Sequence, residues 1–74
     1  MNSHILDLHG VKHYKVDLMV ENFIYLKQEE MPLTIICGNS DKMISLVKDV
    51  LERSKSDYRE GSGHEYGQIK VYKL

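Results

Sequence analysis

Two short apolar runs flank a helix-periodic segment in the first half of the chain, and this order restricts the possible folds more than any other feature. The runs are residues 4–8 (HILDL) and 33–37 (LTIIC), and the segment between them covers residues 13–29. In that segment, apolar residues recur at the helical period, at Val16, Met19, Val20, Phe23 and Leu26. Pro32 ends the helix, because the residue before a proline disfavours the helical conformation. This strand–helix–strand order predicts a parallel strand pair with a right-handed crossover.

The second half of the chain predicts another helix and then two strands. Residues 41–54 have one apolar face, made of Met43, Leu46, Val47, Val50 and Leu51, and Asn39 or Ser40 can cap the start of this helix. Residues 56–61 and 66–73 have the composition of strands, and a glycine-rich turn near residues 62–64 joins them. In the last strand, Ile69 and Val71 should point to one face, and Gln68, Lys70 and Tyr72 to the other.

These elements predict the fold class. We expect residues 1–74 to form a single, free-standing α/β domain, a two-layer β-α-β-α-β-β sandwich with a mixed four-stranded sheet and two helices. The two C-terminal strands should form an antiparallel hairpin at one side of that sheet. The nearly continuous apolar run at 33–37 predicts a strand that is buried on both faces.

Composition excludes several classes of protein. No apolar run approaches 18 residues and no secretory leader is present, which predicts a cytoplasmic protein without a membrane span. The single cysteine, Cys37, excludes an internal disulfide and a multi-cysteine zinc site, and we expect it to pack as a small hydrophobic residue. Ten Lys and Arg residues against eleven Asp and Glu residues give a formal net charge of −1, so binding to nucleic acid would depend on a local basic patch.

Candidate functional residues gather where the two parallel strands should end. Asp7 and His9 share a face of the first strand, and Gly10 follows them. Ligands of open α/β sheets bind beyond the carboxyl ends of parallel strands, where the second helix also presents its positive N-terminal end. The sequence places these residues near that edge: Lys12, His13, Cys37, Gly38, Asn39, Ser40 and Lys42. The combination of an acid, an imidazole, two glycine turns and a helix start suits a phosphate group.

Structural interpretations of the same residues stay open. Asp7 can cap a helix or bond a turn, and His9 can bond to the backbone at the edge of the core. The glycine turn at residues 38–40 is also an ordinary strand-to-helix connection. The four histidines match no standard zinc spacing, so we assign no metal ligands. Tyr14, Tyr66 and Tyr72 can stack on bases or simply lie at the surface.

The run Leu6-Asp7-Leu8-His9-Gly10 resembles the opening motif of the Smr (small MutS-related) domain family. The resemblance extends from His4 to Leu74. Gly67, Ile69 and Val71 fit the family's C-terminal glycine-x-threonine-x-valine pattern, with Ile69 in place of threonine. In the central turn Gly38 matches, but Cys37, Asn39 and Ser40 stand where the family usually has histidine, lysine and glycine.

The resemblance implies a nucleic-acid-binding domain and, in several family members, an endonuclease that nicks DNA or RNA. It implies that Asp7 and His9 are catalytic, with a divalent metal such as Mg²⁺ as an optional cofactor. We expect the nucleic-acid contacts at Gly10, Lys12, His13, Gly38, Asn39, Ser40, Lys42 and Lys70. The missing histidine and lysine of the central turn instead favour nucleic-acid binding without cleavage.

A third hypothesis is a protein-interaction domain that has kept the fold and lost the chemistry, as the slightly negative net charge allows. A homodimer through the edge of the C-terminal hairpin belongs to this hypothesis, because sheet edges present unpaired backbone groups. Lys70 and Lys73 would otherwise serve to keep that edge soluble.

Overall fold

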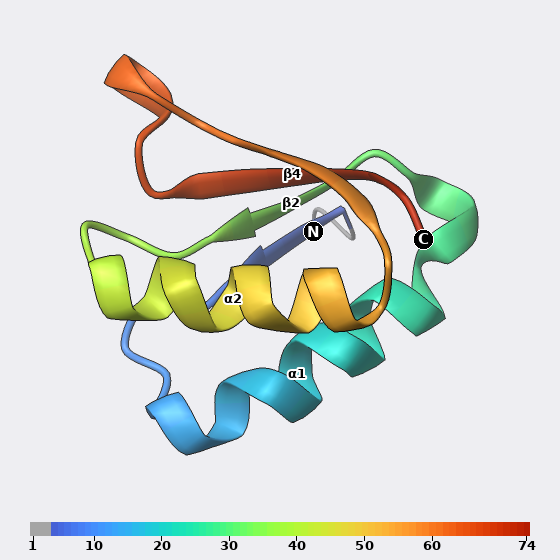
Figure 1. Cartoon of the computed structure of the whole chain (residues 1–74), viewed down its shortest axis with the longest axis horizontal. Helices are drawn as coiled ribbons and strands as arrows, with labels where there is room; N and C mark the ends of the chain where they lie inside the picture. The colour runs from blue at the N-terminus through green and yellow to red at the C-terminus, as the bar shows by residue number, and fades with distance from the viewer. Residues whose placement is uncertain (1–3) are drawn as a thin grey trace.

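The computed structural model describes residues 4–74 and confirms the predicted order of elements (Figure 1). These elements are β1 (Ile5–Asp7), α1 (His13–Leu26), β2 (Leu33–Ile36), α2 (Asp41–Arg53), β3 (Asp57–Glu60) and β4 (Gln68–Lys73), with short 3₁₀ turns η1 (Gln28–Glu30) and η2 (Gly63–Glu65). The first helix ends earlier than predicted, and η1 occupies the rest of the predicted segment before Pro32.

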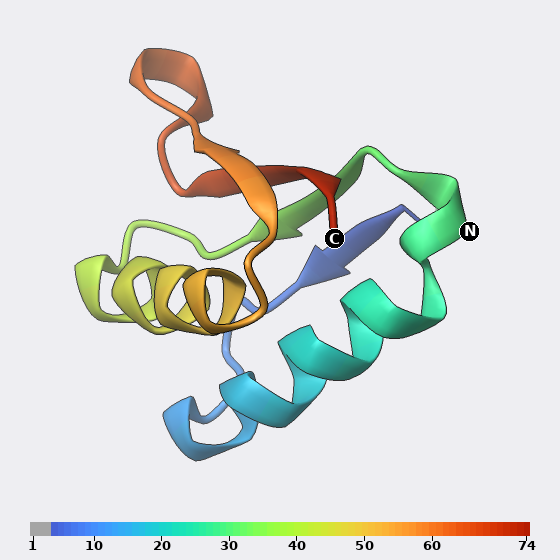
Figure 2. The same ribbon diagram turned by 45° about the vertical axis from the view of Figure 1, so that its right-hand side comes forward.

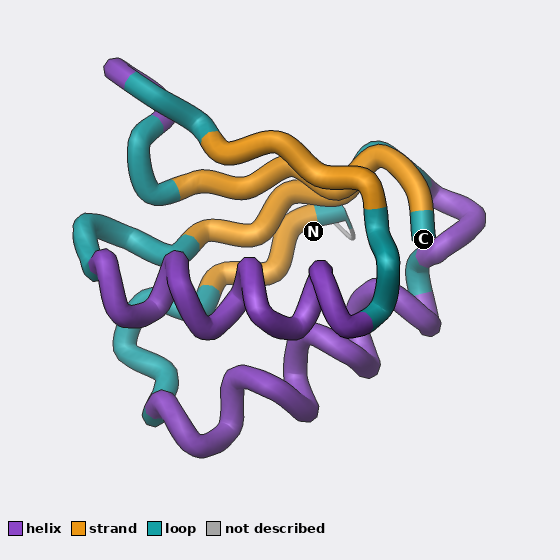
Figure 3. The backbone as a smooth tube through the Cα atoms, viewed as in Figure 1, coloured by secondary structure: helices purple, strands orange, loops and turns teal. Residues whose placement is uncertain are grey.

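The four strands form one mixed sheet in the order β1-β2-β4-β3. Strands β1 and β2 are parallel, whereas β4 pairs antiparallel with both β2 and β3. Both helices cover the same face of the sheet, and no other element of the described chain covers the opposite face (Figure 2). The tube in Figure 3 shows the β3–β4 hairpin, with η2 at its tip, extending away from the two helices. The predicted two-layer α/β class is therefore confirmed.

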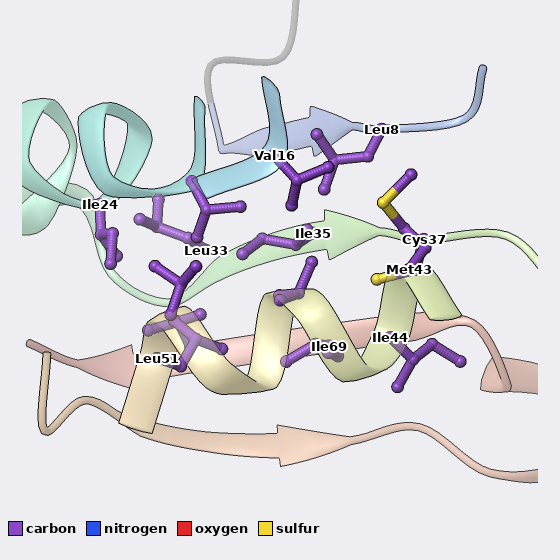
Figure 4. Packing of buried hydrophobic residues seen from close by; sticks show 14 residues of the cluster. Leu8, Val16, Ile24, Leu33, Ile35, Cys37, Met43, Ile44, Leu51 and Ile69 are labelled. Carbon is purple, nitrogen blue, oxygen red and sulfur yellow. The ribbon is translucent and has the colours of Figure 1, made fainter. Parts of the chain in front are cut away.

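The core lies between the helices and one face of the sheet (Figure 4). From the sheet it receives Leu8, Leu33, Ile35, Cys37, Ile69 and Val71, and from the helices Val16, Val20, Ile24, Met43, Ile44, Val47, Val50 and Leu51. In α1 the buried stripe runs through Ile24, whereas Leu26, predicted on the apolar face, is 79% exposed. The i, i+4 spacing of Val16, Val20 and Ile24 explains the difference, since it aligns these three side chains on one side of the helix.

The prediction that residues 33–37 are buried on both faces is wrong. Leu33, Ile35 and Cys37 are buried, but Thr34 and Ile36 are only half-buried. Successive side chains of a strand point to opposite faces, and here only one face carries helices. The outward side chains of β1, β2 and β4 therefore form an open sheet face, which we define by Ile5, Asp7, Thr34, Ile36, Gln68, Lys70 and Tyr72.

The edge of the hairpin also differs from the prediction. Strand β4 lies inside the sheet between β2 and β3, so Lys70 and Lys73 do not form an edge. The edge strand is β3, where Asp57, Arg59 and Glu60 are exposed and the register shifts between Asp57 and Tyr58. Charged side chains and irregular pairing are features that discourage one sheet edge from pairing with another.

Polar contacts attach the hairpin to α2. The Tyr58 hydroxyl donates to the Glu52 carboxylate at 2.7 Å, and the Lys48 ammonium lies 2.8 Å from a carboxylate oxygen of Glu60. The bond to Glu52, with smaller effects of burial and nearby acids, raises the pKa of Tyr58 to about 12. Among the described residues, no helix has the length and apolar character needed to cross a membrane.

Candidate functional site

The two parallel strands end at one edge of the sheet, and both helices begin there, at the left in Figure 1. Asp7 pairs in register with Ile36, and the Leu8 N–H donates to the Ile36 carbonyl at 2.8 Å. Most of the predicted site residues follow directly after these strands: Gly10, Lys12 and His13 after β1, and Gly38, Asn39, Ser40 and Lys42 after β2. Lys70 lies elsewhere, in register with Thr34 within β4 and on the open sheet face.

Asp7 bonds the turn that follows β1. Its Oδ1 accepts a hydrogen bond from the backbone N–H of His9 at 2.9 Å. The bond lies at the surface, and Gly10 continues the turn with a φ of +81°. Within residues 4–74, the His9 imidazole is exposed and has no hydrogen-bond partner. Asp7 therefore positions the backbone of His9 and does not contact its ring.

Cys37 belongs to the core. It is only 3% exposed, its side chain lies near Leu8 and Met43, and burial raises the pKa of its thiol to about 11 (Figure 4). A thiol with so high a pKa is a poor nucleophile at neutral pH. The side chain of Cys37 is thus withdrawn from the site.

The turn after Cys37 packs closely against the start of β4. The Cys37 N–H donates to the Gly67 carbonyl at 2.6 Å. Gly67 has a φ of +91°, and a Cβ atom there would lie 2.5 Å from the carbonyl oxygen of Gly38. A glycine at position 67 is therefore required for this close backbone approach.

The start of α2 already has its polar partners. Ser40 caps the helix, since its Oγ accepts a hydrogen bond from the Met43 N–H at 3.1 Å. Asp41, in the first turn, accepts a hydrogen bond from the Tyr66 hydroxyl. A carboxylate at this position occupies the favourable field of the helix N-terminus and opposes the approach of an anion. Lys42 and Asn39 are exposed at this helix start. The negative charge of Asp41 nevertheless makes the predicted site less favourable for a phosphate group.

The start of α1 is more suitable for an anion. Lys12, His13 and Lys15 are exposed there, and within the described chain no side chain caps the helix and its first turn holds no acidic residue. Tyr14 is 81% exposed, and the Lys15 ammonium lies 5.9 Å from the centroid of its ring. Together with Val11, residues 12–14 line an open, shallow hollow. We name Lys12, His13, Tyr14 and Lys15 the α1 cap cluster.

The sequence-based site did not include Lys15. Its signal was the high density of basic residues, at positions 12, 13 and 15, around a helix start that lacks a Ser, Thr, Asp or Asn cap. Free N–H groups at an uncapped helix start add to the effect of nearby cations. The site predicted from the sequence included Lys12 and His13 at this helix start, together with the glycine turn before α2.

The described residues do not fit a resident metal ion. Within residues 4–74, no three His, Cys, Asp or Glu side chains lie close enough together to hold one. Near His9, Asp7 is the nearest acid in sequence, and one of its oxygens already accepts the His9 N–H. We therefore derive no step through a metal.

No protein-family model, curated protein or solved structure matches this chain. The function is therefore inferred from the fold and the side chains described above.

Proposed function

We propose that the chain is an Smr-like domain that binds nucleic acid through the α1 cap cluster. The observation that carries this proposal is the uncapped start of α1, with Lys12, His13 and Lys15 around it and no acid in its first turn. Lysine side chains and free helix N–H groups bind phosphates. The exposed ring of Tyr14 offers a surface on which an unpaired base can stack.

The balanced total charge does not oppose this proposal, because several acids have cationic partners elsewhere. Asp17 and Glu21 lie 3.3 and 3.9 Å from Arg53, and Glu60 lies 2.8 Å from Lys48. Lys12 and Lys15 form no such ion pair within residues 4–74. A local positive field at the start of α1 is thus compatible with a net charge of −1.

Nicking of the bound strand is an extension of the same proposal. The His9 imidazole is exposed, forms no hydrogen bond within the described residues, and lies three residues before the α1 cap cluster in the sequence. An imidazole so placed can act as a general base toward an attacking hydroxyl or as a general acid toward the leaving oxygen. The role of Asp7 would be to hold the His9 backbone in place.

A protein-interaction function is the second candidate, and the outer side of α1 favours it. Tyr14, Leu18 and Tyr25 are 81%, 64% and 59% exposed, and their spacing aligns them on one side of the helix. Exposed apolar residues that are contiguous mark interaction surfaces more often than scattered ones do. Tyr14 belongs to the proposed surface for nucleic acid and to the proposed surface for protein. The experiment that distinguishes the two functions therefore changes the charged residues of the α1 cap cluster.

Binding is tested by fluorescence anisotropy with a labelled 12-nucleotide oligouridylate and a DNA duplex, from roughly 50 to 200 mM salt. We expect the double variant Lys12→Gln/Lys15→Gln to bind more weakly and with a smaller salt dependence than the wild type. The control Lys55→Gln/Lys73→Gln removes the same charge at exposed positions outside the cluster and should bind like the wild type. Absence of wild-type binding at 50 mM salt, or equal effects of both variants, would contradict the proposal.

Cleavage is tested on supercoiled plasmid and on structured RNA, with and without Mg²⁺. His9→Ala should remove the activity while leaving oligonucleotide binding in place. If the wild type is inactive under all conditions, the nicking extension fails and the binding proposal stands on its own data.

A further inference from the structure

A second polar hollow lies on the open sheet face, away from the α1 cap cluster. Its volume is about 130 Å³, and it is lined by Arg59, Glu60, Gly61, Glu65, Gln68, Lys70 and Tyr72. Gln68, Lys70 and Tyr72 alternate along β4 with the buried Ile69 and Val71, so they point away from the helices. We name this site the β4 hollow.

Two cations face each other across the β4 hollow. Arg59 of β3 and Lys70 of β4 are direct partners in the antiparallel register. Like charges at directly opposite positions of two paired strands destabilise a sheet. Within residues 4–74, neither side chain forms an ion pair. The fold thus keeps two adjacent cations that form no ion pair within the described residues.

The acids near the hollow compensate this charge only in part. Glu60 also lines the hollow, but its carboxylate lies 2.8 Å from the Lys48 ammonium of α2, which balances its charge. Glu65 of η2 lines the hollow and remains the one acid there without an ion-pair partner among the described residues. Two cations against one carboxylate leave an excess of positive charge, which suits an anionic group.

The hollow also offers an aromatic surface, and a row of outward residues joins it to the end of β1. Tyr72 is 48% exposed and lies two residues from Lys70 on the same face. Gln68 pairs with Ile36, which pairs with Asp7, so one row of outward residues crosses the sheet from the end of β1 to the hollow. Strands lie about 4.8 Å apart, so this row covers about 10 Å.

We infer that the β4 hollow binds a phosphate of single-stranded nucleic acid, with Arg59 and Lys70 on the phosphate and Tyr72 against a neighbouring unpaired base. A single strand is favoured over a duplex, because stacking on Tyr72 needs a base that is free of its partner. This inference rests on the proposed function, and it adds a second contact to the same bound strand.

The test uses the full chain and the same labelled oligouridylate. Lys70→Gln and Arg59→Gln should each weaken binding about eightfold at 50 mM salt and reduce the salt slope by about 0.7, the effect of one phosphate contact on a single strand. Tyr72→Ala should weaken binding to the oligouridylate and not to the duplex. Lys73→Gln, at the far end of the same strand, should have no effect. Thermal unfolding should show all four variants folded, with Lys70→Gln at least as stable as the wild type.

The outcomes separate this inference from the proposed function. If the wild type binds and Lys12→Gln/Lys15→Gln weakens binding, but Lys70→Gln and Arg59→Gln behave like Lys73→Gln, the β4 hollow is not a contact and the α1 cap cluster remains. If the wild type binds no oligonucleotide, the proposed function fails as well. A titration with inorganic phosphate, followed by the amide NMR signals of Gln68 and Lys70, completes the test. Signal shifts without oligonucleotide binding would show a site for free phosphate and overturn the single-strand assignment.

Discussion

The Asp7 carboxylate accepts a hydrogen bond from the backbone N–H of His9 at 2.9 Å, so this acid shapes the turn that presents the imidazole. The contact gives a structural reason for the order Asp-x-His-Gly at the end of a strand. The aspartate holds the turn, the histidine points outward, and Gly10 accepts a φ of +81°.

Replacing Asp7 should therefore lower the stability of the protein without lowering its affinity for an oligonucleotide. Asp7→Ala should lower the free energy of unfolding by about 1 kcal/mol, a typical effect of losing a side-chain acceptor for a backbone N–H. Asp7→Asn keeps an acceptor and should cost less than half as much. Both variants remove a negative charge near the α1 cap cluster, so oligonucleotide affinity should rise or stay the same. Urea unfolding and anisotropy measure the two effects, and a loss of affinity in Asp7→Asn would show a direct role of the carboxylate in binding.

Gly67 should be far less tolerant of substitution than Gly63. Both have a positive φ, of +91° and +60°, but only Gly67 lies against the Gly38 carbonyl. Gly63→Ala should cost about 1 kcal/mol of stability, the usual strain of a left-handed residue. Gly67→Ala adds a contact of 2.5 Å with backbone and should cost more than about 3 kcal/mol or prevent folding. Equal Tm values for the two variants would contradict the close approach.

The fold was predictable from the sequence because its core residues repeat at the periods of helices and strands. Val16, Val20 and Ile24 in α1 and the alternation of Ile69 and Val71 in β4 are signals of this kind. The predicted two-layer class implied that one face of the sheet is open, but the apolar run at residues 33–37 has no clear alternation that shows which side chains lie on it. For this reason the apolar run containing Thr34 and Ile36 was predicted to be buried on both sides, although these two residues belong to the open sheet face.

The candidate site was predictable only in its location. The location at the carboxyl ends of the parallel strands followed from topology. Which of the two helix starts is more suitable for an anion depended on side-chain contacts. The bond from Tyr66 to Asp41 joins residues 25 positions apart, and it makes the start of α2 less suitable for an anion. The opposed pair of Arg59 and Lys70 depends on the register of β3 with β4. Neither contact has a signal in the local sequence.

The Cys37 thiol should react slowly in the folded protein. With a pKa of about 11, about one thiol in a thousand is ionised at pH 8, and the side chain is only 3% exposed. We expect modification by a disulfide reagent at pH 8 to be at least a hundredfold slower in buffer than in 6 M guanidinium chloride. Its rate should follow the local opening of the β2–α2 turn. A fast reaction under native conditions would place Cys37 at the surface.

Stability at high pH should report the bond from Tyr58 to Glu52. The folded-state pKa of Tyr58, about 12, lies above the ordinary value of 10, so the fold favours the neutral phenol. Its contribution is complete below pH 10 and is lost as the pH rises from 10 to 12. Lysines and other tyrosines also titrate in this range, so the comparison is between the wild type and Tyr58→Phe. The wild type should be the more stable protein at pH 8, and the difference should shrink toward pH 12. A difference in urea midpoint that stays constant over this range would show that the hydroxyl does not donate to Glu52.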